Sequence, residues 1–128
     1  MDKHKDMVIA INKAFNEDFN ADYIQLVGID TVVDKKTAIP VYHPITKEWK
    51  YHSRWELTGL LRVDLFAPTP TNIFEMGDEI VDFFNKKTIR DVYYEFHGYG
   101  MECKKVDNAS IYTSIIDFEV CSHGWRRV

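Results

Sequence analysis

The feature that most constrains the fold is the alternation within residues 55–66, WELTGLLRVDLF. The odd-numbered positions of this stretch are apolar or glycine, and the even-numbered positions are mostly polar. Because successive side chains of a β-strand point to opposite faces, a period of two predicts a strand with one buried and one exposed face. We therefore expect Leu61, Val63 and Leu65 to lie in the core of the protein.

A short hinge, APTPTN, ends this strand and starts a helix. Thr69 or Thr71 can cap the N-terminus of the helix, and Pro70 suits its first position because proline has no N–H to leave unsatisfied there. Asn72 with Glu75 offers a competing capping-box register. The hinge predicts a sharp turn from strand to helix.

Two segments have the apolar spacing of amphipathic helices: residues 3–18, and the segment from the hinge to about Asn85. The stripe of the first helix could fit a groove on a partner, but packing against the protein's own sheet is the simpler interpretation. The other helix carries acidic side chains at Asp78, Glu79 and Asp82, opposite its apolar side. That apolar side consists of Ile73, Met76, Gly77, Ile80, Phe83 and Phe84.

Residues 38–57 predict an antiparallel hairpin that leads into the alternating strand. Pro40 and Pro44 favour an edge position for its first arm, because proline cannot donate to a strand ladder. The composition of the segment from Pro44 to Lys47 is typical of a turn.

The remaining strands follow from alternating patterns at 92–96 and 110–122. Residues 19–36 could hold one or two short strands around Gly28. No repeat or change of composition divides the chain, which predicts a single domain over residues 1–128. The order of elements predicts an α+β fold: a mainly antiparallel sheet with two helices packed on one face and an extended hairpin.

The charge and composition disfavour several classes of protein. With 16 basic and 20 acidic residues the net charge is −4, and the basic pairs are scattered, whereas tight binding to DNA uses a cluster of about six to ten phosphate contacts. The charged N-terminus lacks the apolar core of a signal peptide. No apolar run approaches the roughly 20 residues that span a bilayer. The two cysteines are too few for a disulfide framework and predict reduced thiols in the cytoplasm.

Four residues could supply nitrogen and sulfur ligands to a metal: His97, Cys103, Cys121 and His123. Structural zinc sites usually show two close pairs of ligands, and only Cys121 with His123 forms such a pair. The glycines are isolated, so the sequence has no phosphate-binding loop. We therefore expect no bound metal, no cofactor and no catalytic residues.

Aromatic residues gather on the predicted hairpin at Tyr42, Trp49, Tyr51 and Trp55. This is more aromatic surface than one thin hairpin can bury. The tip of the hairpin is charged, which suits the polar rim of an interface. We predict that these four residues contact a neighbouring subunit or another partner, with packing of Trp49 over its own turn as the alternative.

The segment at about 50–84 resembles the bacteriophage tail terminator family, also called tail completion proteins, to which the lambda minor tail protein U belongs. In that family a strand ends in a pattern of valine, aspartate, hydrophobic and aromatic residues, and a helix follows after a small-residue hinge. The matching positions here are Val63, Asp64, Leu65, Phe66 and Ala67. The order of elements matches over about residues 1–123, but residues 34–50 cannot be aligned to the family.

The resemblance implies a structural assembly protein without enzymatic activity. Members of the family form a ring, usually a hexamer, that caps the completed tail tube, stops its polymerisation and docks the head or neck. The implied partners are further copies of the chain, the tail tube protein and a head–tail connector or neck protein. DNA would pass through the lumen without specific binding, because an acidic lumen repels it. The implied location is the tail–neck junction of the virion, with the host cytoplasm during assembly.

Three alternatives stay open at this stage. The first is another head–tail joining protein of the neck or connector. The second, from a different class, is a small metal-binding or enzymatic α+β domain that uses His97, Cys103, Cys121 and His123. The third is an interaction module of cellular origin.

Overall fold

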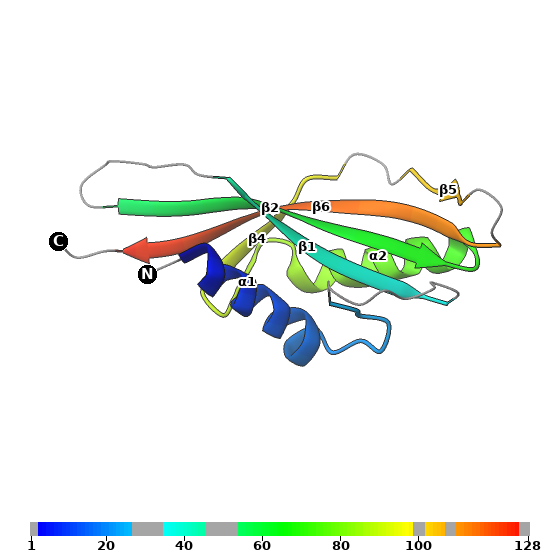
Figure 1. The fold of residues 1–128 in the computed structure, drawn as a ribbon, viewed down its shortest axis with the longest axis horizontal. Helices are drawn as coiled ribbons and strands as arrows, with labels where there is room; N and C mark the ends of the chain where they lie inside the picture. The colour runs from blue at the N-terminus through cyan, green and yellow to red at the C-terminus, as the bar shows by residue number, and fades with distance from the viewer. Residues whose placement is uncertain (1–2, 27–34, 46–53, 99–101, 107–109, 126–128) are drawn as a thin grey trace.

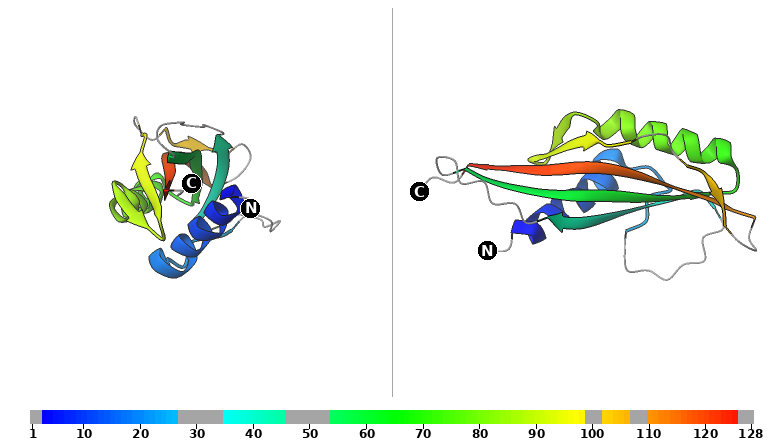
Figure 2. Two further views of the ribbon diagram at one scale, coloured as in Figure 1. Left: turned by 90° about the vertical axis from the view of Figure 1, so that its left-hand side faces the viewer. Right: turned by 90° about the horizontal axis from the view of Figure 1, so that it is seen from above.

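A computed structural model describes residues 3–26, 35–45, 54–98, 102–106 and 110–125. It shows a six-stranded antiparallel sheet with two helices on the same face of the sheet (Figures 1 and 2). The strands lie in the order β1-β2-β6-β4-β3, and β5 pairs with the first residues of β6. This confirms the α+β class that the sequence predicts.

The helices are α1 (Lys3–Lys13), which continues as the π-helix η1 (Ala14–Phe19), and α2 (Pro70–Phe84). The strands are β1 (Thr37–Ile45), β2 (Arg54–Ala67), β3 (Lys87–Ile89), β4 (Val92–Phe96), β5 (Lys104–Lys105) and β6 (Tyr112–Trp125). The two long strands β2 and β6 pair along their whole length and form the centre of the sheet.

The alternation of β2 determines which face of the sheet is buried. Leu61, Val63 and Leu65 are fully buried, whereas Arg62 and Asp64 between them are partly exposed. Because β2 pairs with β1 on one side and with β6 on the other, its buried residues adjoin the buried residues of both neighbours. The predicted strand face is confirmed.

Helix α2 begins where the sequence predicts. The Thr69 hydroxyl accepts a hydrogen bond from the Asn72 N–H at 3.2 Å, so Thr69 and not Thr71 is the N-cap. At the other end, Lys87 Nζ donates to the carbonyl oxygen of Asp82 at 3.1 Å. A cation at this position also interacts favourably with the negative end of the helix dipole.

The first helix is not one regular helix over residues 3–18. Its last turn, Ala14–Phe19, widens into a π-helix. Asn20 ends it in the left-handed conformation, with a φ of 52°, and its N–H donates to the carbonyl oxygen of Phe15 at 3.1 Å. Asparagine tolerates this conformation better than most residues, which explains why the helix ends there.

The hairpin of β3 and β4 is missing from the sequence-based predictions. Its two turn residues, Arg90 and Asp91, have positive φ values of 52° and 65°, a geometry that Asn-Gly or Asp-Gly more often provides. The Arg90 guanidinium donates to Asp18 at 2.6 Å and lies 3.3 Å from Glu17. This hydrogen bond lowers the pKa of Asp18 and joins the turn to the end of η1.

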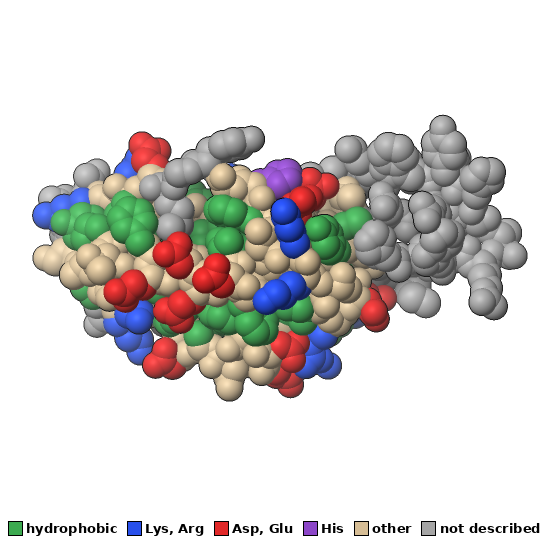
Figure 3. Space-filling model, turned by 180° about the vertical axis from the view of Figure 1, so that it is seen from behind, with side chains coloured by type: hydrophobic (Ala, Val, Ile, Leu, Met, Phe, Trp, Pro, Cys, Tyr) green, Lys and Arg blue, Asp and Glu red, His purple; other side chains and the backbone are tan. Residues whose placement is uncertain are grey.

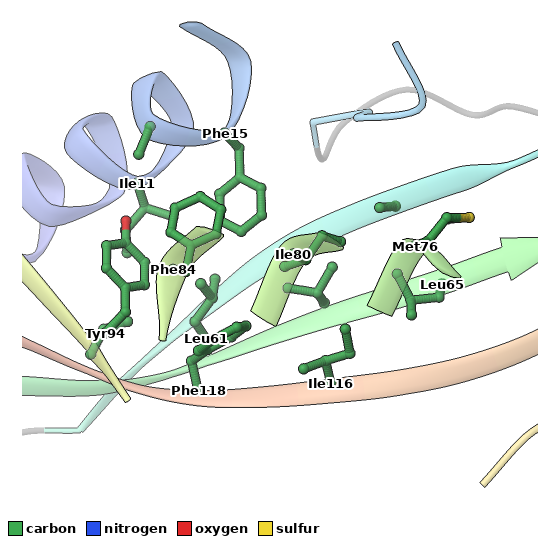
Figure 4. Close-up of a cluster of buried hydrophobic side chains, with 14 of the residues drawn as sticks. Ile11, Phe15, Leu61, Leu65, Met76, Ile80, Phe84, Tyr94, Ile116 and Phe118 are labelled. Atoms are coloured by element: carbon green, nitrogen blue, oxygen red, sulfur yellow. The ribbon is translucent and has the colours of Figure 1, made fainter. Parts of the chain in front are cut away.

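Side chains from both helices and from the central strands converge in one core, which Figure 4 shows in close-up. Phe84 lies at its centre: its ring is 4.3 Å from that of Phe15 and 4.7 Å from that of Tyr94, between centroids. Phe118 of β6 completes the contact at 6.2 Å. Phe84 therefore joins η1, α2 and the sheet.

Strand β1 is an edge strand, as its prolines predict. The N–H of Ala38 donates to the carbonyl oxygen of Tyr23 at 2.8 Å, and the carbonyl oxygen of Ala38 accepts from the Gln25 N–H at 2.9 Å. Both hydrogen-bonding groups of Ala38 therefore face away from β2. Pro40 and Pro44 lie two and six residues further on and face the same way. Their missing N–H groups therefore cost the β1–β2 ladder nothing.

The β1–β2 ladder continues further than the sequence predicts. Pro44 pairs with Gly59 and Ile45 pairs with Thr58, so the predicted turn does not begin at Pro44. Residues 46–53 lie outside the described part of the chain. Among the described residues, the first residues of β2, 54–57, pair only with β6. Figures 1 and 2 show this two-stranded ribbon extending past the ends of both helices.

The segment at 19–36 is only partly described. Within it, Ile24 forms an isolated parallel bridge with Ala38 on the edge of β1. Residues 27–34, which include Gly28, lie outside the described residues, and so does any strand predicted there.

Candidate interaction surface

The face of the sheet that points away from α1 and α2 is covered by neither helix. Its side chains come from alternate positions of β1, β2 and β6, and most of them are half-buried. Apolar and charged groups are mixed on it, as they are at protein–protein interfaces. The central residues of this open face are Ile39, Val41, Leu60, Arg62, Asp64, Phe66, Ile115 and Asp117.

An ion pair crosses the centre of the open face. Arg62 donates two hydrogen bonds to the Asp117 carboxylate, at 3.0 and 3.4 Å, and this contact raises the pKa of the guanidinium further. Asp64 lies in the next row, between Ile39 and Ile115. Partial burial there raises the pKa of the Asp64 carboxyl, an effect that the nearby Arg62 partly opposes.

A groove of about 410 Å³ opens on this face beside β6. Phe96 and Ile115 give it apolar walls, and Ile115 is 46% exposed. Its charged lining consists of two ion pairs, Arg62 with Asp117 and Lys104 with Glu102. His97 also lines it, with its Nε2 3.1 Å from a carboxylate oxygen of Glu119. A groove with apolar walls and charged groups beside them suits a side chain from a protein partner.

The groove lies where the pairing of β6 is interrupted. β4 pairs with residues 118–122 and β5 with residues 112–113. Between them, residues 114–116 pair with β2 on their other side, and no described strand pairs with them on this one. In the described part of the chain, the groove therefore lies over the stretch of β6 between its two short partner strands.

Tyr42, one of the four aromatic residues predicted to form an interface, makes contacts within the subunit. Its hydroxyl lies 2.8 Å from His4 Nδ1 and donates to Met7 Sδ at 3.4 Å, which joins β1 to α1. Burial raises the pKa of Tyr42 to about 12. These contacts leave its role at an interface a prediction.

The other three aromatic residues fall outside what the structure describes. Trp49 and Tyr51 lie in the segment 46–53, and only the backbone of Trp55 is described, at the start of β2. The described residues of the open face, in contrast, were not predicted from the sequence to form an interaction surface. The polar alternate positions of the strand at 55–66 were the signal that could have indicated them.

Replacing Gly59 by alanine is expected to destabilise the protein by about 1–3 kcal/mol, the usual cost of overpacking. The Tyr42 ring lies across Gly59, so an added Cβ would collide with it. Chemical denaturation of Gly59→Ala in the natural and in the Tyr42→Ala background measures this cost. The penalty should shrink when the ring is absent; an equal penalty in both backgrounds would show that the ring is not the cause.

Of the four residues that could ligate a metal, the structure describes the side chains of His97, Cys103 and Cys121. No group of three or more His, Cys, Asp or Glu side chains that could hold a metal ion occurs in the described part of the chain. Cys103 and Cys121 are partly buried and form no disulfide, and the side chain of His123 lies outside the described residues. No helix in the described ranges is long and apolar enough to cross a membrane.

Comparison with known proteins adds a similarity of fold. No protein-family model matches the chain, and no curated protein matches its sequence. A chain of a solved structure described as "Virion of native gene transfer agent (GTA) particle" has a similar fold, with a TM-score of 0.67. The two chains are 7% identical, and the match covers 91% of this chain and 93% of the other. At this identity the likeness shows a shared fold.

Proposed function

We propose that this protein is a structural component of a phage-like virion. The observation that carries the proposal is the fold similarity, which extends over 91% of this chain to a chain from the virion of a gene transfer agent particle. A match over 91% of this chain and 93% of the other extends well beyond a common strand–helix motif. The role is one of binding and assembly, without catalysis or a cofactor.

Within the virion, we propose that the protein caps the completed tail tube as a ring, stops its polymerisation and presents the docking surface for the head or neck. The strand–hinge–helix segment of β2 and α2 supports this position, because it resembles the tail terminator family. The open face of the sheet and the ribbon of β2 and β6 offer surface for more than one partner. The proposed partners are further copies, the tail tube protein and a neck or connector protein.

The test adds purified protein to tail tubes assembled from the tube protein of the same phage or particle. Wild-type protein should bind tube ends and stop their growth, whereas a Trp49→Ala, Tyr51→Ala double variant should cap poorly, because these aromatic residues lie on the predicted contact. The control is a Thr88→Ala, Glu95→Ala variant, which removes two exposed side chains of β3 and β4. Electron microscopy of tube lengths measures the effect.

Each outcome is informative. A folded aromatic variant that caps as well as wild type would exclude the hairpin as the contact. Wild-type protein that ignores tube ends but binds the connector would indicate a neck protein. Binding to neither would contradict the proposed function.

A further inference from the structure

Three of the four exposed large hydrophobic side chains in the described residues lie on the two helices. Val8 and Ile9 of α1 are 37% and 44% exposed, and Phe74 of α2 is 43% exposed. The fourth, Ile115, lies at the groove on the open face. Both helices therefore carry apolar residues on the side that faces away from the sheet.

On α1, Ile9 lies near the middle of the outward side. The buried residues Met7, Ile11 and Ala14 define the opposite side of the helix. Lys5 and Lys13, both exposed, lie four residues before and four residues after Ile9 and therefore share its side. We call these three residues the α1 stripe; Asp6, also exposed, borders it.

On α2, the outward side is acidic. Phe74, Asp78 and Asp82 follow one another at intervals of four residues, and all three are exposed. We call them the α2 stripe. Exposed Glu75 and Glu79 flank it, and Glu79 also accepts a hydrogen bond from the Tyr23 hydroxyl at 3.2 Å. Figure 3 shows the carboxylates gathered on the face of the molecule where α2 lies.

The two stripes are opposite in charge, and their spacing allows one apolar contact and one ion pair to form together. Each has a large apolar side chain four residues from a charged one. Because a lysine lies four residues to either side of Ile9, an Ile9–Phe74 contact would place one of the lysines opposite Asp78 whichever way the helices run. At 1.5 Å of rise per residue, each stripe extends over about 12 Å.

The stripes also lie on different sides of the molecule. Seen along the length of the sheet in Figure 2, the two helices occupy opposite flanks of the layer beneath it. A subunit with complementary surfaces on two flanks binds the next subunit head to tail, and such heterologous contacts close into a ring when the rotation between subunits permits it.

We propose that the α1 stripe of one copy packs on the α2 stripe of a second copy. This inference rests on the proposed function, because it names the contact that builds the ring. The Ile9–Phe74 contact removes apolar surface from water. The opposite charges of the lysines and aspartates favour the pairing of α1 with α2. An α2 stripe facing another α2 stripe would bring like charges together, which disfavours that pairing.

Charge reversal tests the contact. Lys5→Glu with Lys13→Glu reverses the α1 stripe, and Asp78→Lys with Asp82→Lys reverses the α2 stripe. Either variant alone should associate at least about tenfold more weakly than wild type, since like charges would then meet at every contact. Sedimentation velocity at low salt and the number of subunits retained on tail tubes provide the two measurements.

Mixing the two variants provides the decisive result. In a mixed assembly that alternates the two chains, every α1–α2 contact joins opposite charges again, so association should return. Control variants with the same changes of net charge, away from both the stripes and the groove, are Lys35→Glu with Lys105→Glu, and Asp22→Lys with Glu95→Lys, all exposed positions. These controls should associate as wild type does.

The outcomes separate this inference from the proposed function. If wild-type protein forms rings on tail tubes and the stripe variants form them equally well, the α1–α2 contact is wrong. The capping role would then remain intact. Stripe variants that weaken association but do not recover on mixing would also overturn the α1–α2 contact. Wild-type protein that neither associates nor binds tubes would overturn the proposed function.

Discussion

Replacing Phe84 by alanine is expected to lower the free energy of unfolding by about 3–5 kcal/mol, the range for large aromatic residues in cores. Phe84 is completely buried, and its ring contacts Phe15 from the first helix and Tyr94 from the sheet. Removing the ring would leave a cavity between three elements. These elements cannot move together to fill it, because hydrogen bonds between the strands hold the sheet in place.

The comparison for this variant is Phe74→Ala, the same substitution on the same helix at a side chain that is 43% exposed. Surface changes of this kind usually alter stability by no more than about 0.5 kcal/mol. Urea denaturation of both variants in monomeric protein measures the difference. If the two variants lost similar amounts of stability, the central place of Phe84 in the core would be wrong.

Leu61→Ala is expected to cost about 2–5 kcal/mol, as large-to-small changes in cores usually do. Leu61 is fully buried beneath the helices, and its neighbour Leu60 lies on the opposite, partly exposed face of the same strand. Leu60→Ala is therefore a matched control and should cost clearly less. A loss below about 0.5 kcal/mol for Leu61→Ala would mean that the two faces of β2 are reversed.

The segment from β2 through α2 could be predicted in detail because its signals are local. Each of these signals depends on residues that are close together in the sequence. They are the period of two in the strand, the Thr69 cap and the apolar side of the helix. Here local preference and tertiary packing agree. That agreement explains why Leu61 and Ile80 are both buried in the core, as the sequence predicts.

The parts that were missed depend on distant residues or on unusual turn chemistry. Arg90 and Asp91 adopt positive φ values without the glycine that normally indicates such a turn. Arg90 also bonds to Asp18, 72 residues earlier in the chain. No window of local sequence contains that contact, so neither the β3–β4 hairpin nor its link to the π-helical turn could be predicted.

The candidate surface was predictable only in part. The polar positions of β2 indicate an exposed face, but its ion pair joins Arg62 to Asp117, and that register cannot be read from either strand alone. Tyr42 was predicted to face a partner, whereas the sequence gives no sign that His4 and Met7 would contact its hydroxyl. Aromatic content indicates available contact area but not its direction.

The prolines of β1 have a consequence for how copies of this chain can associate. Along the outward side of this edge, Ala38 already bonds to residues 23 and 25, and Pro40 and Pro44 have no N–H to donate. A second copy that tried to extend the sheet there would find few donors for a continuous ladder, so open-ended, amyloid-like stacking is blocked at this edge. Contacts between copies at this edge must then use side-chain surfaces, whose geometry can limit the number of copies.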